Sequence, residues 1–287
     1  MFNKRHIVRT IAATVSILAL SFTAACGSGQ STASNSTDSD DITQQTYKPG
    51  KLTIATGQPA YEPWVMNDKP ESGEGYEAAV AYAVADKLGF KKSDVVWTRT
   101  AFDTAIAPGA KDWDFNIQQF GITDERKKAV DSSSSYYNDS QSVVVKKDSK
   151  FANATKVSDL KDATVGVMVG TLAYDYAKAN IKDDIQTFND DAALAQALDA
   201  GQIDALVTST VECVYMVQSE QVKDAKVLGR LPDSEDKSGM GIVLPKDSKL
   251  TAAVTKAVDD LNADGTIKKL QDKWLAEYTT DLTELKK

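Results

Sequence analysis

Short apolar runs alternate with helical patterns along most of the chain, and this alternation limits the folds open to it. Residues 52–55 and 203–207 have the length of buried strands, whereas the apolar residues between 76 and 88 fall on one helical face that ends at Gly89. Parallel strands need long crossovers, which are usually helices, so this order is typical of largely parallel sheets covered by helices. We therefore predict an α/β fold.

The patterned region is long for one hydrophobic core. About 240 residues follow residue 48 of the 287-residue chain, and domains typically hold about 50–200 residues. Two lobes are therefore expected rather than one. Near the end of the chain, the pattern predicts two helices interrupted at residues 262–265.

The first 25 residues carry the features of a secretory signal peptide. Three basic side chains precede the uncharged stretch 11–22, and the small residues Ala24 and Ala25 stand just before Cys26. The uncharged stretch between Arg9 and Cys26 is shorter than the roughly 20 apolar residues that a membrane-spanning helix needs. We expect cleavage after residue 25.

The segment around Cys26 predicts attachment to a membrane by lipid. Residues 23–26, TAAC, resemble a bacterial lipobox, although Thr23 stands where a leucine is commoner. The resemblance implies that Cys26 becomes a lipidated N-terminus, with acyl chains that contribute roughly 0.8 kcal/mol per buried methylene. Residues 26–48 contain few large apolar side chains and are expected to form a disordered tether. The remaining cysteine, Cys213, is expected to be a buried small hydrophobe.

Charge and histidine content exclude several classes of function. Removal of residues 1–25 takes away three of the 33 basic residues and none of the 41 acidic ones, which leaves a net charge of −11. Nucleic acid is therefore not an expected partner. The only histidine, His6, is removed as well, so Ser-His and Cys-His nucleophiles and imidazole metal sites are excluded. We expect neither a metal nor a cofactor.

Residues 118–126, QQFGITDER, follow a short apolar run and are expected to open a helix. In open parallel sheets, ligands bind beyond the carboxyl ends of strands, where helix N-termini offer free N–H groups. Gly121 would allow close approach of a ligand, Thr123 could cap the helix, and Arg126 could bind a carboxylate through two parallel hydrogen bonds. The alternative is that Arg126 belongs to a solvated run with Lys127 and Lys128.

Asp190 and Asp191 open another predicted helix, residues 190–200. A carboxylate pair of this kind could serve acid-base chemistry. Capping and the helix dipole explain it better, because each stabilises a helix start by roughly 0.3–1 kcal/mol.

Short motifs spread over residues 51–278 point to one family: YEPW at 61–64, GYE at 75–77, GITDER at 121–126 followed by 130–131 and 136–137, and the stretches 166–171, 201–205, 264–266 and 273–274. Together they resemble the family 3 extracellular solute-binding proteins, which supply polar amino acids to ABC importers. The resemblance implies a type II periplasmic-binding-protein-like fold with a ligand in the cleft between two lobes. Residues 49–137 plus 240–287 would form lobe 1 and residues 138–239 lobe 2, with hinges near 136–140 and 235–240.

The resemblance also implies roles for individual residues. In the family, an arginine and a threonine hold the α-carboxylate of the ligand and aromatic rings enclose its side chain. Backbone groups and a threonine from the second lobe complete the site. Carried over, the ligand-binding residues are Tyr61, Trp64, Phe102, Gln119, Gly121, Thr123, Arg126, Thr171 and Ser209.

This sequence departs from the family where acids are expected. Ser209 stands where an aspartate usually takes the ligand ammonium, Gly57 replaces another frequent acid, and Met168 stands where glutamine binders carry a lysine. Either Glu212 or another acid supplies the missing charge, or the ligand lacks a standard ammonium group.

The expected function is that of a monomeric, lipid-anchored receptor on the outer face of a bacterial membrane. It would capture a small carboxylate-bearing solute, with an amino acid as the expected ligand, and deliver it to an ABC permease with its cytoplasmic ATPase. An enzyme of the dehydratase or peptidoglycan-cleaving type is the alternative, with Glu62 or Glu212 as its acid. A ligand sensor is a third possibility. We expect a binding protein and not an enzyme.

Overall fold

The computed structural model describes residues 41–279 and 282–287. The predicted signal peptide, Cys26 and most of the predicted tether therefore lie outside the described residues. The end of the tether range does take up structure: residues Ile42–Gln44 form one 3-10 turn, and the backbone N–H of Tyr47 donates to Asp114. No helix in the described part of the chain is long and apolar enough to cross a bilayer.

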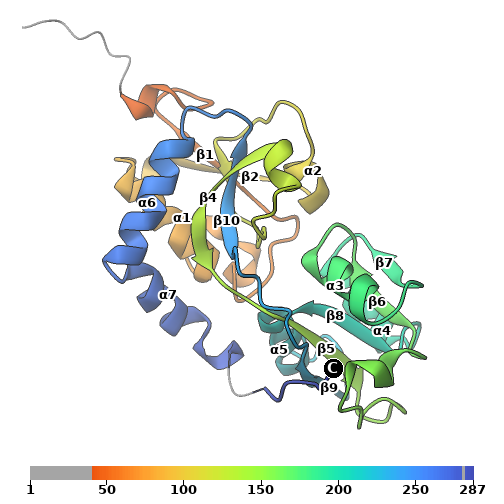
Figure 1. Ribbon diagram of the computed structural model, residues 1–287. Helices are drawn as coiled ribbons and strands as arrows, with labels where there is room; N and C mark the ends of the chain where they lie inside the picture. Colours follow the sequence, from red (N-terminus) through yellow and green to blue (C-terminus); the bar gives the residue numbers. More distant parts are fainter. Residues whose placement is uncertain (1–40, 280–281) are drawn as a thin grey trace, which may run out of the picture. The chain divides into compact units, whose positions relative to one another are not determined.

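The described strands form two five-stranded sheets, which can be followed separately in Figure 1. The first has the order β2-β1-β3-β10-β4, and its strands are β1 Leu52–Thr56, β2 Val95–Arg99, β3 Phe115–Asn116, β4 Val130–Tyr137 and β10 Met240–Pro245. The second has the order β7-β6-β8-β5-β9, and its strands are β5 Gln141–Lys146, β6 Val165–Met168, β7 Gln186–Phe188, β8 Ala205–Ser209 and β9 Ala225–Arg230.

Helices connect the strands, so the α/β prediction is confirmed. The α-helices are α1 Tyr76–Lys87, α2 Phe102–Ile106, α3 Leu172–Asn180, α4 Asp191–Asp199, α5 Thr210–Gln218, α6 Thr251–Ala263 and α7 Thr266–Trp274. Further 3-10 turns are η2 Met66–Asp68, η3 Pro70–Ser72, η4 Lys92–Asp94, η5 Arg126–Lys128, η6 Val157–Leu160 and η7 Ala276–Tyr278.

Both sheets are mixed, and they are mixed in the same way. Strand β1 pairs in parallel with β2 and β3, and β6 pairs in parallel with β7 and β8. In each sheet one strand runs against its neighbours, and it is the strand by which the chain enters from the other sheet: β5 after β4, and β10 after β9. The chain also returns to the second sheet at its end, where Glu284 bridges to Arg230 and Lys286 to Lys156. These last residues fall within the range that the sequence assigns to lobe 1.

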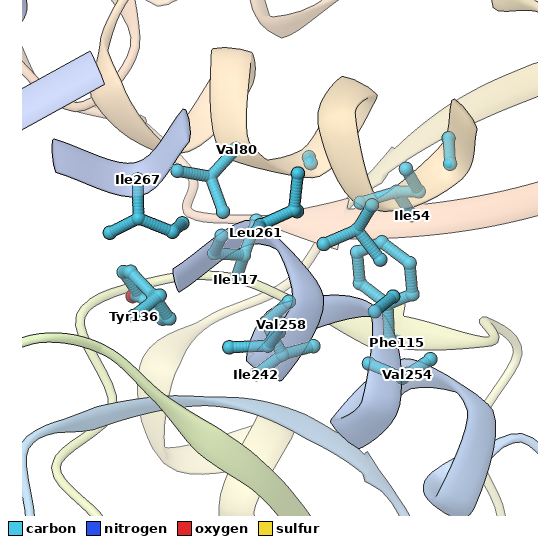
Figure 2. Close-up of a cluster of buried hydrophobic side chains, with 14 of the residues drawn as sticks. Ile54, Val80, Phe115, Ile117, Tyr136, Ile242, Val254, Val258, Leu261 and Ile267 are labelled. Atoms are coloured by element: carbon cyan, nitrogen blue, oxygen red, sulfur yellow. The ribbon is translucent and has the colours of Figure 1, made fainter. Parts of the chain in front are cut away.

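The first sheet buries one face against α1, α6 and α7. Figure 2 shows Ile54 of β1, Phe115 of β3 and Ile117, which follows β3, in one cluster with Val80 of α1 and Leu261 of α6. The 3.6-residue spacing of the apolar positions in α6 places them on the side that faces the sheet. The helical pattern of the sequence was therefore a correct guide to this core.

Helices cover both faces of the second sheet. Alternate residues of a strand point to opposite faces, so one strand contributes to both clusters. Val143 and Val145 contact one cluster with α3, whereas Val144 lies in the other with α4 and α5. Cys213 of α5 is fully buried in that second cluster, as the sequence predicted.

One expected helix is absent from the structure. The sequence predicted a helix from about Thr123, but the chain makes only the single 3-10 turn η5 before β4 begins at Val130. From Val130 onward the chain pairs with β10 as strand β4, so no further helical turn follows η5. The helix N-terminus expected to offer free N–H groups at this point therefore does not form.

Gly75 fixes the approach of α1 to the loop before it. The carbonyl of Trp64 accepts hydrogen bonds from the N–H groups of Glu77 and Ala78, and so serves the first turn of α1 as a cap. Gly75 has φ +100°, and a Cβ atom there would lie 2.5 Å from the carbonyl oxygen of Trp64. Only glycine satisfies both conditions.

Replacing Gly75 with alanine is expected to destabilise the protein more than the same change at Gly265. Both have positive φ, which costs an alanine about 1–2 kcal/mol, but a Cβ at Gly265 would meet nothing within 4 Å. The clash at Gly75 should add roughly 1–3 kcal/mol. Urea unfolding of the two variants measures the difference, and equal losses would contradict this packing.

Candidate functional site

A cavity of about 400 Å³ lies where the parallel strands of both sheets end. Its wall contains residues that follow β1, β2 and β3 of the first sheet and β6, β7 and β8 of the second. This is the position where ligands bind in open α/β sheets. The wall includes Gly57, Tyr61, Trp64, Phe102, Gln119, Gly121, Arg126, Met168, Thr171, Asp191, Ser209 and Glu212.

Arg126 contacts both sides of this cavity. Its guanidinium donates to the carbonyl oxygen of Gly121 at 2.7 Å and to that of Gly170 at 2.7 Å. The guanidinium also lies over the ring of Phe102, 5.3 Å from its centroid. Burial lowers the pKa of Arg126, but a guanidinium remains protonated in proteins. The geometry favours the interpretation of Arg126 as a cavity residue over that of a solvated charge.

The hydroxyl groups of Thr123 and Thr171 form hydrogen bonds with backbone groups of the protein. The hydroxyl of Thr123 accepts from the N–H of Arg126 at 3.1 Å, and Thr123 does not appear in the cavity wall. Thr171 lies in the wall, caps α3 by accepting from the N–H of Tyr174, and donates to the carbonyl of Met168. All the sequence-predicted ligand-binding residues except Thr123 therefore line the cavity.

Two aromatic residues of the 61–64 motif connect the sheets. The hydroxyl of Tyr61 accepts from the N–H of Ala192 at 3.3 Å, in the first turn of α4. Trp64 is fully buried, packs edge-on against Tyr137 with ring centroids 5.6 Å apart, and donates its indole N–H to Glu212. Trp64 thus supports the cavity wall as well as forming part of it.

Glu77 holds one wall residue in an unusual backbone conformation. Gln119 has φ +50°, which is uncommon outside glycine. The Glu77 carboxylate accepts from the backbone N–H of Gln119 at 2.7 Å, from its side-chain amide and from the hydroxyl of Tyr136. Burial raises the pKa of Glu77 to about 7. The sequence did not mark Glu77 as a site residue; its signal was a charge among the buried positions of α1.

Three further carboxyl groups gather at the ends of β5, β7 and β8. Glu212 is only 3 % exposed, and burial followed by the neighbouring charge of Asp191 raises its pKa well above the ordinary value. Burial also raises the pKa of Asp191 to about 6 and that of Asp139 to about 6. Asp190 caps α4 by accepting from the N–H of Ala193, as the sequence predicted. Asp191 does not share that role: it faces the cavity and accepts from the hydroxyl of Thr208.

The unliganded protein is expected to lose stability as the pH rises from 5 to 8. Glu77 and Asp191 bind protons in the folded state up to about pH 7 and 6, but their pKa values in an unfolded chain are near 4.5 and 3.8. In this window the unfolded state binds fewer protons, so the free energy of unfolding falls, by roughly 1–3 kcal/mol. Glu77→Gln should flatten the slope, whereas the exposed Glu71→Gln should not. Parallel slopes of Glu77→Gln and wild type in urea titrations would refute this account.

Comparison with known proteins adds to this geometry. A model of the bacterial extracellular solute-binding proteins, family 3, matches residues 52–277. The chain is 29% identical to the L-arginine-binding protein of Pseudomonas aeruginosa over 80% of this chain and 88% of that protein. It is 29% identical to the L-cystine-binding protein TcyJ of Escherichia coli, over 77% and 81%. The solved structure of an ancestral arginine-binding protein bound to arginine superposes with a TM-score of 0.67 at 30% identity, covering 79% of this chain and 98% of that one.

Proposed function

Because this chain belongs to the bacterial extracellular solute-binding proteins of family 3, we propose that it captures an amino acid outside the cytoplasm and delivers it to the permease of an ABC importer. The named relatives are binding proteins for arginine and cystine, which supports an amino acid as the solute. The protein acts as a monomer, and the ATPase that drives transport lies on the other side of the membrane. Its own task is capture and presentation, without chemical change of the ligand.

The observation that carries this proposal is the position of Arg126. Its guanidinium has five N–H donors, and two protein carbonyls take up only part of them. The ligand carboxylate would bind the remaining donors, with Phe102 behind the guanidinium and Gly121 allowing close approach. Because Arg126 contacts Gly170 across the cavity, a carboxylate bound there would join residues from both sheets.

Arg126→Lys is expected to weaken binding of the amino-acid ligand about tenfold to more than a hundredfold, because lysine keeps the charge but lacks the planar fork. Lys127→Ala is the matched control, since the Lys127 side chain is 53% exposed and does not line the cavity. Calorimetric titration of both variants at unchanged melting temperature measures the effect. Equal, small losses of affinity in the two variants would show that Arg126 does not bind the ligand.

The same samples distinguish a receptor from an enzyme. Glu212 is the observation that favours an enzyme, because a buried acid with a raised pKa is what general acid-base catalysis requires. Its contact with the indole of Trp64 and its like-charged neighbours are equally suited to holding a cation. Chromatography after long incubation should return the ligand unchanged; turnover that is lost in Glu212→Gln would contradict the receptor.

We further propose that the protein is exported and held at the membrane through Cys26, with residues 27–40 as the connecting tether. The lipobox-like residues 23–26 and the signal features before them support this anchoring. Cys26→Ser should release the protein into the soluble fraction without changing its affinity for the ligand. Membrane fractionation and immunoblotting test this, and retention of a normally processed Cys26→Ser chain in the membrane fraction would exclude lipid anchoring.

A further inference from the structure

We propose that Asp139, Asp191 and Glu212 form a subsite for a cationic group, so that the ligand is an amino acid with a positively charged side chain. This inference rests on the proposed function, because it takes Arg126 as the partner of the ligand carboxylate. It assigns the positively charged end of the ligand side chain to acids from three other segments of the chain.

The three carboxyl groups come from separate elements and face one cavity. Glu212 lies in the first turn of α5, Asp191 begins α4, and Asp139 lies between β4 and β5. Their mutual influence appears in the raised pKa of Glu212, to which both aspartates contribute after burial. Two neighbouring acids, Asp190 and Glu77, add further negative charge around them.

Two of these carboxyl groups are almost fully buried and incompletely bonded. Glu212 and Asp139 are 3% and 7% exposed. One oxygen of Glu212 accepts from Trp64, and no donor among the described residues bonds to its other oxygen. The Oδ2 atom of Asp139 has no hydrogen-bond partner in the described part of the chain, although Ser209 and the N–H groups of Thr210 and Val211 lie near enough to its carboxylate to lower its pKa. A buried carboxylate that lacks donors is costly, and a cationic ligand group supplies both donors and charge.

The cavity wall holds more carboxyl groups than one α-ammonium can pair with. The wall holds six carboxyl groups, and within the described residues Arg126 is its only basic side chain. A zwitterionic amino acid with a neutral side chain would leave that excess unchanged, because its carboxylate and ammonium cancel. A side chain with its own positive charge reduces it. The six acids are Asp103, Asp139, Asp190, Asp191, Asp236 and Glu212.

The acids near Arg126, the proposed partner of the ligand carboxylate, differ from those near Glu212 in the proposed cation subsite. The carboxylates that act on Arg126 are Asp175 and Asp236, whereas those that act on Glu212 are Asp191, Glu77 and Asp139. An α-carboxylate and an α-ammonium share one carbon atom, so they suit adjacent partners. A guanidinium or ammonium at the end of a side chain suits a separate acidic cluster.

Pairs of ligands that differ only in the side-chain charge test this assignment in the wild-type protein. Citrulline has almost the shape of arginine but no charge, and norleucine lacks the ammonium of lysine. Calorimetry should show arginine or lysine bound at least about ten- to a hundredfold more tightly than its neutral counterpart, as expected for a charge-assisted contact. Equal affinities within both pairs would overturn the subsite, as would tighter binding of cystine than of either basic amino acid.

Substitutions of single acids test which residues cause the preference for a positively charged side chain. In Glu212→Gln and Asp191→Asn, the preference for arginine over citrulline should shrink toward unity, whereas it should persist in Asp199→Asn. Asp199 belongs to the same helix as Asp191 but pairs with Lys146 away from the cavity. An unchanged preference in both cavity variants, with folding verified by urea unfolding, would overturn the assignment.

The outcomes also separate this inference from the proposed function. If neutral and basic amino acids bind equally and Arg126→Lys weakens both, only the cation subsite falls. If no amino acid binds the wild-type protein, the proposed function fails and the subsite fails with it.

Discussion

The parallel pairing of β1 with β2 and β3, and of β6 with β7 and β8, determines where this protein can hold a ligand. Parallel strands end at the same edge of a sheet, so the loops that follow them meet there. Because each sheet contributes such an edge, Arg126 after β3 comes within hydrogen-bond distance of Gly170 after β6. The helices support this arrangement, and the first turns of α2, α4 and α5 add Phe102, Asp191 and Glu212 to the cavity wall.

Acidic groups in the cavity explain a tension between stability and binding. Burial raises the pKa values of Glu77 and Asp191, and this lowers the stability of the folded state at neutral pH. Natural proteins tolerate such groups where function requires them. In this chain, Glu77 orders Gln119 in the wall, and Glu212 is held by Trp64. The cost of these charges is therefore concentrated around the one cavity that holds Arg126.

The sequence was informative where local patterns decide structure. Apolar periodicity identified β1, α1 and α6, and the cap at Asp190 followed from one side chain and its own backbone. The same local reasoning failed after Thr123, because pairing of β4 with β10 prevents the expected helix. That pairing joins segments about a hundred residues apart, so no window around Thr123 contains it.

Residues whose roles depend on distant neighbours were the least predictable. Asp191 resembles its neighbour Asp190 in sequence, and only the position of Thr208 and Glu212 distinguishes its environment. Glu77 appeared as part of a family motif, but its function depends on Gln119 and Tyr136. Arg126 was a candidate from its local setting and lies in the cavity wall, but the sequence could not show that the carbonyls of Gly121 and Gly170 fix its guanidinium. A crystal structure of the protein with a bound amino acid tests the central claim most directly. We predict a carboxylate oxygen about 2.8 Å from the guanidinium of Arg126; a carboxylate bound elsewhere, with Arg126 contacting only protein carbonyls, would contradict it.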